Sequence, residues 1–446
     1  MRALFILILL PLTLHAQVIE QKDPVIEKIV SAINADSLRY NVNKLVGFGT
    51  RHTLSGHPSE GRGIVAAREW VLSVFDDYAK KTQEQMIARM DRWILNPDGK
   101  RIDATVEMAN VMAILHGTDT TDKRILIICA HLDSRVSDAM NRKSDAPGAN
   151  DDGSGVAAVI EAARVLSKYK FPATIIFAVL SGEEQGLLGG EHLAELAKQE
   201  AWNVTAVLNN DIIGGDNINQ NGSTGNGQLR VFSEGLPAMA TPVMFNTIRR
   251  YGLENDGASR QLARYIEEIA ARYVANLDVR MIYRNDRYLR GGDHLPFADR
   301  GFPAVRFTEW NENYDHQHQD LQIQDGKKMG DLTEFMDFEY LRKNTATNVS
   351  VLANLAKSPR SPIDVTMDIR KLSNSTFISW KPGDRKRTAG FYVLTRETTA
   401  AQWQKKQFTP ANEIELACSK DNYFFAVQSV SQEGNESLPV VPTNGK

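Results

Sequence analysis

Three short stretches of the sequence concentrate carboxylates and histidine, the residue types that bind divalent metal ions through oxygen and nitrogen. They are segments 130–134 (Ala-His-Leu-Asp-Ser), 149–155 (Ala-Asn-Asp-Asp-Gly-Ser-Gly) and 181–186 (Ser-Gly-Glu-Glu-Gln-Gly). Asp211 and two histidines within 313–320 add further ligand types. Unpaired acids crowded into one crevice would repel one another and resist burial, and bound cations remove that objection. The sequence therefore predicts a centre for a borderline divalent ion, with nitrogen and oxygen donors and no thiolate.

Each of these residues has a simpler structural explanation when it is considered alone. His131 could be a structural or surface histidine, and the Glu183-Glu184 pair could lie on a solvated face. Asp211 could belong to a turn, and Asp151 could cap the apolar helical segment that comes after it. The metal centre is favoured because all of these ligand types coincide at the ends of predicted strands.

The elements that must position these residues alternate between strand and helix patterns. Four runs that are apolar on both faces predict central strands covered by helices on each side. The runs cover residues 124–130, 174–180, 205–208 and 304–307, and the intervening helices are expected at about 156–169 and 186–199. We therefore expect an α/β fold with a mostly parallel, mixed central sheet. Open α/β sheets bind ligands outside the carboxyl ends of their strands, so the polar groups there should share one crevice.

The region before this sheet is predicted to be helical from residue 23 to residue 80. Asp23 suits a helix N-cap and Pro24 the first helical position, and residues 63–78 show a second helical pattern. The turn signal Asn-Pro-Asp-Gly at 96–99 lies between two strand-like runs and predicts a hairpin.

Composition and targeting signals restrict the class of protein. The chain has 446 residues and a formal net charge of −3, which argues for two or three domains and against a nucleic-acid partner. Met1-Arg2, an apolar run at 3–14 and a small residue at 16 predict a signal peptide over residues 1–16, hence an exported, periplasmic or extracellular protein. The run is too short to span a membrane, so no stable membrane insertion is expected. Cys129 and Cys418 fall in different predicted domains, and Cys129 is expected to be a buried free thiol.

The C-terminal segment, residues 359–446, predicts a small β-sandwich after a proline-containing linker. It resembles a fibronectin type III module, with Trp380 as an early core tryptophan and Tyr423 near the strand before the last turn. We expect it either to contact a protein or glycan or to pack against the rest of the chain. The remaining residues, 17–358, would form the catalytic domain.

Taken together, the motifs His131-x-Asp133, Asn150-Asp151, Glu183-Glu184, Asp211 and a final His resemble the di-zinc aminopeptidases of metallopeptidase family 28. The resemblance covers roughly residues 40–355. It implies a zinc exopeptidase-like fold and two Zn²⁺ ions, for which other divalent transition metals could substitute.

The family assigns a role to each matching position. Asp151 resembles the carboxylate that bridges both metals, His131 and Asp211 would complete one site, and Glu184 and the final His would complete the other. Glu183 resembles the general base, and Asp133 the partner that orients His131.

Two assignments rest on finer points of the family pattern. The family tends to place its final His four residues before an acid, which selects His316 over His318 because Asp320 lies at that spacing. Tyr314 is the candidate for holding the carbonyl oxygen, although Asp315 separates it from His316. His294 matches a family segment that lines the site without binding metal. The remaining histidines are expected to be structural or at the surface: His52, His57, His116 and His192.

The resemblance predicts an exported, zinc-dependent aminopeptidase acting on peptides or proteins with a free amino terminus. Two alternatives stay open: a glutaminyl cyclase-like enzyme with one zinc, and a catalytically inactive binding protein on the same fold. The residues themselves do not show which amino acid is preferred at the cleaved terminus. They also do not distinguish aminopeptidase action from dipeptidase or carboxypeptidase action.

Overall fold

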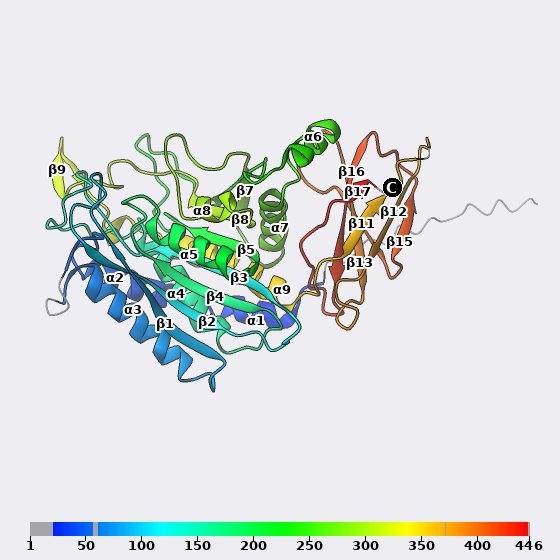
Figure 1. Cartoon of the computed structure of the whole chain (residues 1–446). Helices are drawn as coiled ribbons and strands as arrows, with labels where there is room; N and C mark the ends of the chain where they lie inside the picture. Colours follow the sequence, from blue (N-terminus) through cyan, green and yellow to red (C-terminus); the bar gives the residue numbers. More distant parts are fainter. Residues whose placement is uncertain (1–20, 57–60, 371, 445–446) are drawn as a thin grey trace, which may run out of the picture.

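A computed structural model describes residues 21–56, 61–370 and 372–444, and its centre is an eight-stranded mixed sheet (Figure 1). The strand order is β1-β2-β4-β3-β5-β8-β6-β7. The bounds are β1 Met86–Leu95, β2 Val106–Leu115, β3 Arg124–His131, β4 Thr174–Leu180, β5 Asn203–Asn210, β6 Gln228–Ser233, β7 Asp278–Ile282 and β8 Ala304–Glu309. The neighbours β4, β3, β5 and β8 are parallel, whereas β2 pairs antiparallel with β4 and β6 with β8. The predicted fold class and the β1–β2 hairpin are confirmed.

The central strands are apolar on both faces because both faces are covered. In β3, Leu126 and Ile128 belong to the larger core, and Ile127 and Cys129 belong to a smaller core on the opposite side. Cys129 is a buried free thiol, as predicted. Alternation of side chains across the strand sends neighbours to opposite faces, so a run without polar residues needs helices on each side.

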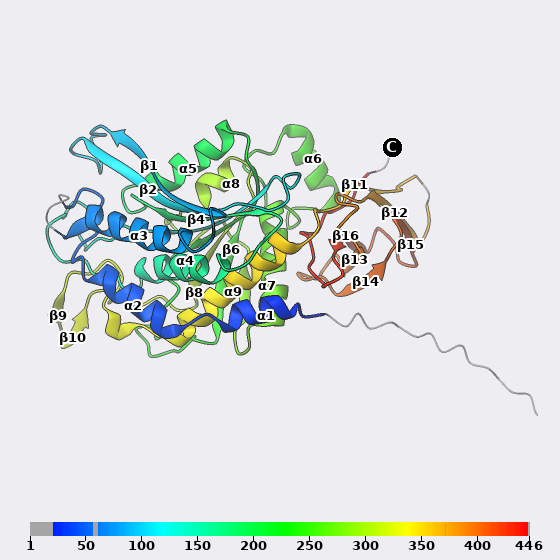
Figure 2. The ribbon, with the colours of Figure 1, turned by 90° about the horizontal axis from the view of Figure 1, so that it is seen from below.

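Helices cover the two faces unequally, with most of them beneath the sheet in the view of Figure 2. The larger group comprises α1 Pro24–Ser31, α2 Ala35–Val46, α3 Gly63–Ala79, α4 Gly153–Leu166, α7 Ala258–Tyr273 and α9 Phe338–Lys357. The other face carries α5 Leu188–Gln199 and α8 Leu295–Asp299, and α6 Pro242–Tyr251 lies near the C-terminal domain. The predicted cap of the first helix is present, since the Asp23 side chain accepts from the backbone N–H of Val25.

Shorter elements complete this part of the chain. They are the hairpin of β9 Gln322–Gln324 and β10 Lys327–Met329 and the 3₁₀ helix Thr333–Phe335. Among the described residues, no helix combines the length and hydropathy that a membrane crossing needs. The predicted signal peptide lies outside the described residues.

The C-terminal strands form the expected sandwich-like pair of sheets. One sheet has the order β15-β12-β11-β17 and the other β14-β13-β16. Their bounds are β11 Ile363–Met367, β12 Thr376–Lys381, β13 Gly390–Glu397, β14 Lys405–Thr409, β15 Glu413–Leu416, β16 Tyr423–Val430 and β17 Thr443–Asn444. Trp380 is buried between the sheets and meets Phe391 edge-on, with ring centroids 5.3 Å apart. The predicted domain boundaries and the fibronectin type III resemblance stay predictions.

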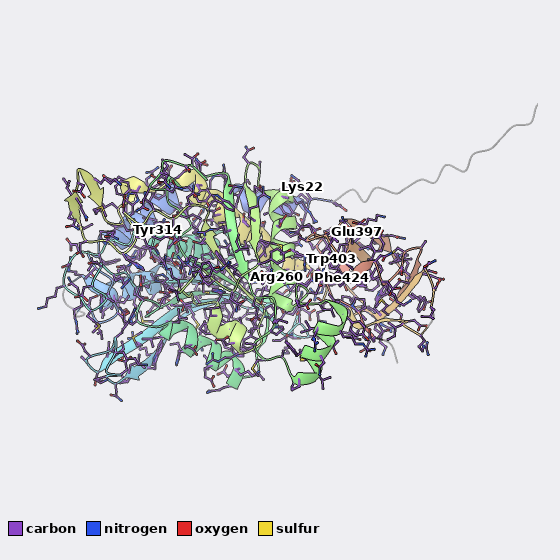
Figure 3. All side chains as sticks on the ribbon, turned by 90° about the horizontal axis from the view of Figure 1, so that it is seen from above. Lys22, Arg260, Tyr314, Glu397, Trp403 and Phe424 are labelled. Atoms are coloured by element: carbon purple, nitrogen blue, oxygen red, sulfur yellow. The ribbon has the colours of Figure 1, made fainter. Side chains whose placement is uncertain are left out.

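Buried ion pairs join the sandwich to α7. Glu436 receives both terminal nitrogens of Arg272, at 2.9 and 2.8 Å, and Lys406 Nζ at 3.0 Å. Asp256 receives Arg396 at 2.6 Å and Arg264 at 3.3 Å. Figure 3 shows Trp403 and Phe424 at this junction, where the guanidinium of Arg396 lies over both rings.

Candidate metal centre

The polar residues predicted at strand ends converge at one edge of the sheet. His131 is the last residue of β3, Glu183 and Glu184 come after β4, and Asp211 comes after β5. Because β4, β3 and β5 are adjacent and parallel, their carboxyl ends meet at this edge. Asp151 comes from the loop that leads into α4.

The side chains form two groups of three that could each hold a metal ion. One group is His131, Glu183 and Asp211, and the other is Asp151, Glu184 and His318; within each group the ligand atoms lie within 4.8 Å of one another. Asp151 lies between the groups: its Oδ1 is 3.1 Å from His131 Nε2 and its Oδ2 is 2.9 Å from His318 Nε2. Asp151 therefore contacts a histidine of each group, and its role as a carboxylate shared by two ions stays a prediction.

The structure corrects the choice between the two late histidines. His318, not His316, reaches the acids, with Nε2 2.8 Å from Glu184 Oε1. The ring of His316 instead stacks on Phe335, with centroids 3.7 Å apart. Asp320, the acid whose spacing favoured His316, accepts a hydrogen bond from the Ser137 hydroxyl at 2.9 Å. The spacing between His316 and Asp320 therefore does not identify the histidine that faces the acids. His318 also has φ +56°, an uncommon conformation for a residue other than glycine, which turns its ring toward the acids.

Asp133 positions two parts of the centre through different atoms. Its backbone oxygen is 3.0 Å from His131 Nδ1, while its carboxylate oxygen is 3.8 Å from that nitrogen. The carboxylate accepts backbone N–H groups of Gly182, Glu183 and Glu184, at 2.7, 3.2 and 3.0 Å. Asp133 thus orients His131 through its carbonyl and shapes the Glu183-Glu184 loop through its side chain.

Two acids that the sequence analysis did not single out hold the Asp151 loop. Asp152 caps α4 by accepting from Gly155 N–H at 2.9 Å and also accepts from His131 N–H at 3.1 Å. Asp331 accepts from the N–H of Asp151 at 2.7 Å. Asp152 could have been found as a helix cap, whereas Asp331 carries no local signal because it is distant in sequence.

Two arginines and one glutamine also contact the candidate ligands. Arg306 Nη2 is 2.9 Å from Asp211 Oδ2, and Arg135 Nε is 3.1 Å from Glu184 Oε2. Gln317 donates its amide to Asp151 Oδ2 at 3.0 Å. These contacts orient carboxylates that would otherwise rotate freely.

Burial and mutual repulsion perturb the acids of the centre. Burial, with the charges of Glu184 and Asp211 nearby, raises the pKa of Glu183 well above its usual range. Burial raises the pKa of Asp293 to about 7, and within the described residues neither of its oxygens has a hydrogen-bond partner. Burial alone would raise the pKa of Asp151, but His318 and His131 hold it well below its usual range.

For the histidines, burial and the neighbouring acids act in opposite directions on the pKa. Burial would lower the pKa of His318, but Glu184 and Asp151 raise it to about 10. Asp151 and Asp211 likewise hold the pKa of His131 above its usual range, against burial. A proton on His318 and a divalent cation compete for the same pair of carboxylates.

Divalent cations fit this donor set. Glu184 Oε1 is buried 2.8 Å from His318 Nε2, and the ligand atoms are imidazole nitrogens and carboxylate oxygens. Such atoms bind zinc and related ions, and positive charge would stabilise acids that burial otherwise disfavours.

Tyr314 and the remaining histidines make no direct contact with the candidate ligands in the contacts that the described residues show. The side chain of Tyr314 is exposed, and within the described residues no hydrogen bond or ion pair joins it to the candidate ligands (Figure 3). His294 is buried, with Nε2 2.7 Å from the backbone oxygen of Asn285. His52 is buried and bonded to the backbone oxygen of Ala139, and His192 stacks on Trp93. His57 lies outside the described residues.

Comparisons with known proteins place this geometry in context. The profile of peptidase family M28 matches residues 110–335. A protein from Leptosphaeria maculans named probable zinc metalloprotease is 40% identical over 421 residues, covering 94% of this chain and 97% of its own. A protein of the same name from Pyrenophora teres f. teres is 38% identical, covering 94% and 87%.

Solved structures share the fold at lower identity. The LapA aminopeptidase of Legionella pneumophila has a TM-score of 0.53 and 18% identity, covering 76% of each chain. The aminopeptidase of Aneurinibacillus sp. strain AM-1 has a TM-score of 0.51 and 16% identity, covering 74% of this chain and 96% of its own. At these identities the likeness concerns the fold.

Proposed function

Because this chain belongs to peptidase family M28, we propose that it is an exported, zinc-dependent aminopeptidase with two metal ions. One observation carries the proposal: two groups of nitrogen and oxygen donors lie on either side of Asp151, which faces a histidine of each group. A single metal would leave one of these groups of buried acids without a metal ion.

The proposed ligands follow from the contacts. His131 and Asp211 would hold one zinc, Glu184 and His318 would hold the other, and Asp151 would serve both. The names of the relatives support zinc, and the apolar residues 3–14 support export. Zinc in such a site supplies a Lewis acid for the scissile carbonyl and lowers the pKa of water.

Glu183 is the proposed general base. Its pKa is raised by burial and by Glu184 and Asp211, so its carboxylate accepts a proton more readily than an exposed one. The base takes a proton from the attacking water and returns it to the leaving amine. The structure also places Glu183 near His131 and Asp211, which admits a ligand role. Zinc content of the Glu183→Gln variant distinguishes the two roles.

The surplus of carboxylates supports recognition of a cationic amino terminus. Asp293 is buried near the centre, and neither of its oxygens has a hydrogen-bond partner in the part of the chain that the structure describes. A protonated or metal-oriented amine at this end of a peptide suits such surroundings better than a carboxylate does. Two proteins with the same fold, LapA of Legionella pneumophila and the enzyme of Aneurinibacillus sp. strain AM-1, are named aminopeptidases, which supports this choice.

The test uses purified full-length protein and matched peptides with free and with acetylated amino termini. We expect cleavage of only the free peptides, loss of activity with a chelator, and recovery with zinc. Equal cleavage of acetylated peptides would refute the aminopeptidase assignment. A peptide with amino-terminal glutamine, followed by mass spectrometry, distinguishes hydrolysis from cyclisation.

The two late histidines provide a matched pair of variants for the metal assignment. His318→Ala should lose about one zinc per chain and most activity, because His318 is a proposed ligand. His316→Ala removes a ring that stacks on Phe335 and should keep both zinc ions. Metal analysis of the dialysed proteins measures the difference, and the reverse pattern would restore His316.

The C-terminal sandwich is proposed to be a fibronectin type III-like module. Its buried Trp380 and its two packed sheets support the resemblance. The ion pairs to α7 favour a module fixed to the catalytic domain, with its outer sheet faces available to protein or glycan.

A further inference from the structure

Arginines outnumber carboxylates in one part of the junction between α7 and the sandwich. Asp256 forms ion pairs with Arg264 of α7, at 3.3 Å, and with Arg396 of β13, at 2.6 Å. Arg260, also of α7, makes no ion pair among the described residues, and its guanidinium lies 4.0 Å from the centroid of the Tyr283 ring. The group therefore contains three buried cations and one acid in ion-pair contact.

The other buried ion pairs that join the sandwich to α7 are balanced. Arg272 and Lys406 each contact both Glu436 and Glu268, so two cations meet two acids. The group around Asp256 differs because its cations exceed the acids that contact them.

Two further acids face these arginines without balancing them. The charge of Arg260 acts on Glu234, and that of Arg264 acts on Glu267, but no ion pair joins either pair in the described part of the chain. Burial raises the pKa of both acids to about 7, so each carboxyl group is partly neutral near that pH. The positive charge of the three arginines is therefore left largely uncompensated.

Each of the three arginines also has buried N–H groups that meet no acceptor within the described residues. They are Nε and Nη1 of Arg260, Nη2 of Arg264 and Nε of Arg396. Neighbouring nitrogens are bonded, since Arg264 Nε donates to the backbone oxygen of Ala401 and Arg396 Nη1 to that of Ala400, each at 2.7 Å. A buried donor without an acceptor costs free energy, so these nitrogens mark a place for one.

The pKa values reflect the missing negative charge. Burial lowers the pKa of Arg260 to about 10. Burial also lowers the pKa of Arg264, against the charge of Asp256, and the positive charge of Arg396 lowers it further. An anion bound among these groups would stabilise their charged forms.

A cavity of about 210 Å³ lies beside these side chains and between the two domains. Arg264 and Tyr283 line it on one side, and Arg396 and Phe424 line it on the sandwich side (Figure 3). The exposed residue Thr399 lies at its mouth. The volume exceeds the ~30 Å³ that one water molecule occupies in the liquid, so the cavity can admit a small anion.

We infer that this cavity binds one tetrahedral dianion, inorganic sulfate or phosphate, through Arg264 and Arg396 with Arg260 nearby. Three guanidinium groups and one carboxylate leave a surplus of two positive charges, which a dianion balances and a monocarboxylate does not. Guanidinium groups suit such oxyanions because they present several N–H donors in one plane. Since Arg264 belongs to α7 and Arg396 to β13, the bound ion links the catalytic domain to the sandwich.

The test measures binding of sulfate and of phosphate to the full-length protein by calorimetry, in chloride buffer at fixed ionic strength. Each should bind at one junction site per chain, and more tightly than the monoanion acetate. Arg264→Gln should weaken binding at this site by roughly 10- to 100-fold, because a charged hydrogen-bond donor is lost. Arg89→Gln, at an exposed position on β1, removes the same charge and should bind like wild type.

A second variant tests the site without breaking a buried ion pair. Thr399→Glu places a carboxylate at the exposed mouth of the cavity and should abolish sulfate binding there while the protein stays folded. Ser73→Glu makes a comparable change on the exposed face of α3 and should bind like wild type. Sulfate should also raise the thermal midpoint of wild-type protein but not that of Thr399→Glu, because the ion binds the folded junction.

The control variants distinguish this cavity from other places where an anion could bind. Equal sulfate binding by wild type, Arg264→Gln and Thr399→Glu would overturn the site, because the ion would then bind elsewhere, such as the candidate metal centre. Acetate that binds as tightly as sulfate would overturn the dianion assignment. Equally weakened binding in Arg89→Gln and Ser73→Glu would also overturn the site, since binding would then follow the total charge of the protein.

Discussion

The molecule buries carboxylates at two places and balances them differently. At the junction with the sandwich, the chain surrounds Glu436, Glu268 and Asp256 with its own cations: Arg272, Lys406, Arg264 and Arg396. At the edge of the central sheet, direct contacts from arginine reach only Asp211 and Glu184 among the candidate ligands that the structure describes. The other acids there face histidines, backbone N–H groups or one another.

The pKa values follow this difference. Burial would raise the pKa of Glu436, but Lys406 and Arg272 hold it below its usual range. Burial raises that of Glu183, and the neighbouring acids Glu184 and Asp211 raise it further. A buried acid cluster that the chain neutralises itself is structural, whereas one that it leaves negative is suited to bind cations.

The largest expected effect is the loss of catalysis when Glu183 is replaced. Glu183→Gln keeps the shape of the side chain and removes proton transfer, so turnover should fall by about 10²- to 10⁴-fold. Zinc content, measured by metal analysis, and the free energy of unfolding should change little. Loss of zinc in this variant would show that Glu183 is a ligand.

A substitution at the junction with the sandwich should lower the free energy of unfolding and leave the zinc affinity unchanged. Glu436→Gln leaves Arg272 and Lys406 buried without their shared carboxylate, which costs about 3 kcal/mol of unfolding free energy. Urea unfolding measures the loss, and zinc affinity should stay the same. Glu397→Gln, an exposed position on the same domain, is the control and should be neutral. Weakened zinc binding in Glu436→Gln would mean that the two clusters are coupled.

Removing metal is expected to destabilise the folded protein by a slightly smaller amount for each ion that is lost. Free zinc at about 100 times its dissociation constant stabilises the folded state by about 2.7 kcal/mol per site. Chelation should lower the unfolding free energy by an amount of that order, in wild type and in Glu436→Gln alike. Urea unfolding with and without a chelator measures it. No change on chelation would contradict cation binding to the folded protein.

The smallest effect concerns acid stability at the junction. Burial would raise the pKa of Asp122, but Arg124 and then Arg387 of the sandwich lower it to about 2, from 3.8. Because the folded pKa is depressed, the stabilisation of about 2 kcal/mol is complete above pH 3.8 and is lost as pH falls toward 2. Asp122→Asn should show a smaller loss of stability between those pH values than wild type. Parallel acid curves for both proteins would contradict the pairing.

Several features could be predicted because their signals are local. The apolar run at 174–180 became β4 with the same bounds, and the cap at Asp23 became the start of α1. Asp133 was predicted as the partner of His131, and the structure places its backbone carbonyl against His131 Nδ1. The choice of His316 failed because a motif spacing does not record which way a loop turns each side chain.

The sequence by itself determined which residue types would be present at the strand ends, because apolar periodicity sets the strands and the chain order places the acids and His131 directly at their ends. Only the tertiary structure decided the partners. Asp331 and Arg306 approach the centre from segments far away in the chain, Arg135 is close to His131 in sequence but contacts Glu184, and His318 rather than His316 contacts the acids. Local patterns arise from the covalent order of residues, whereas contacts between distant segments depend on how the whole core packs.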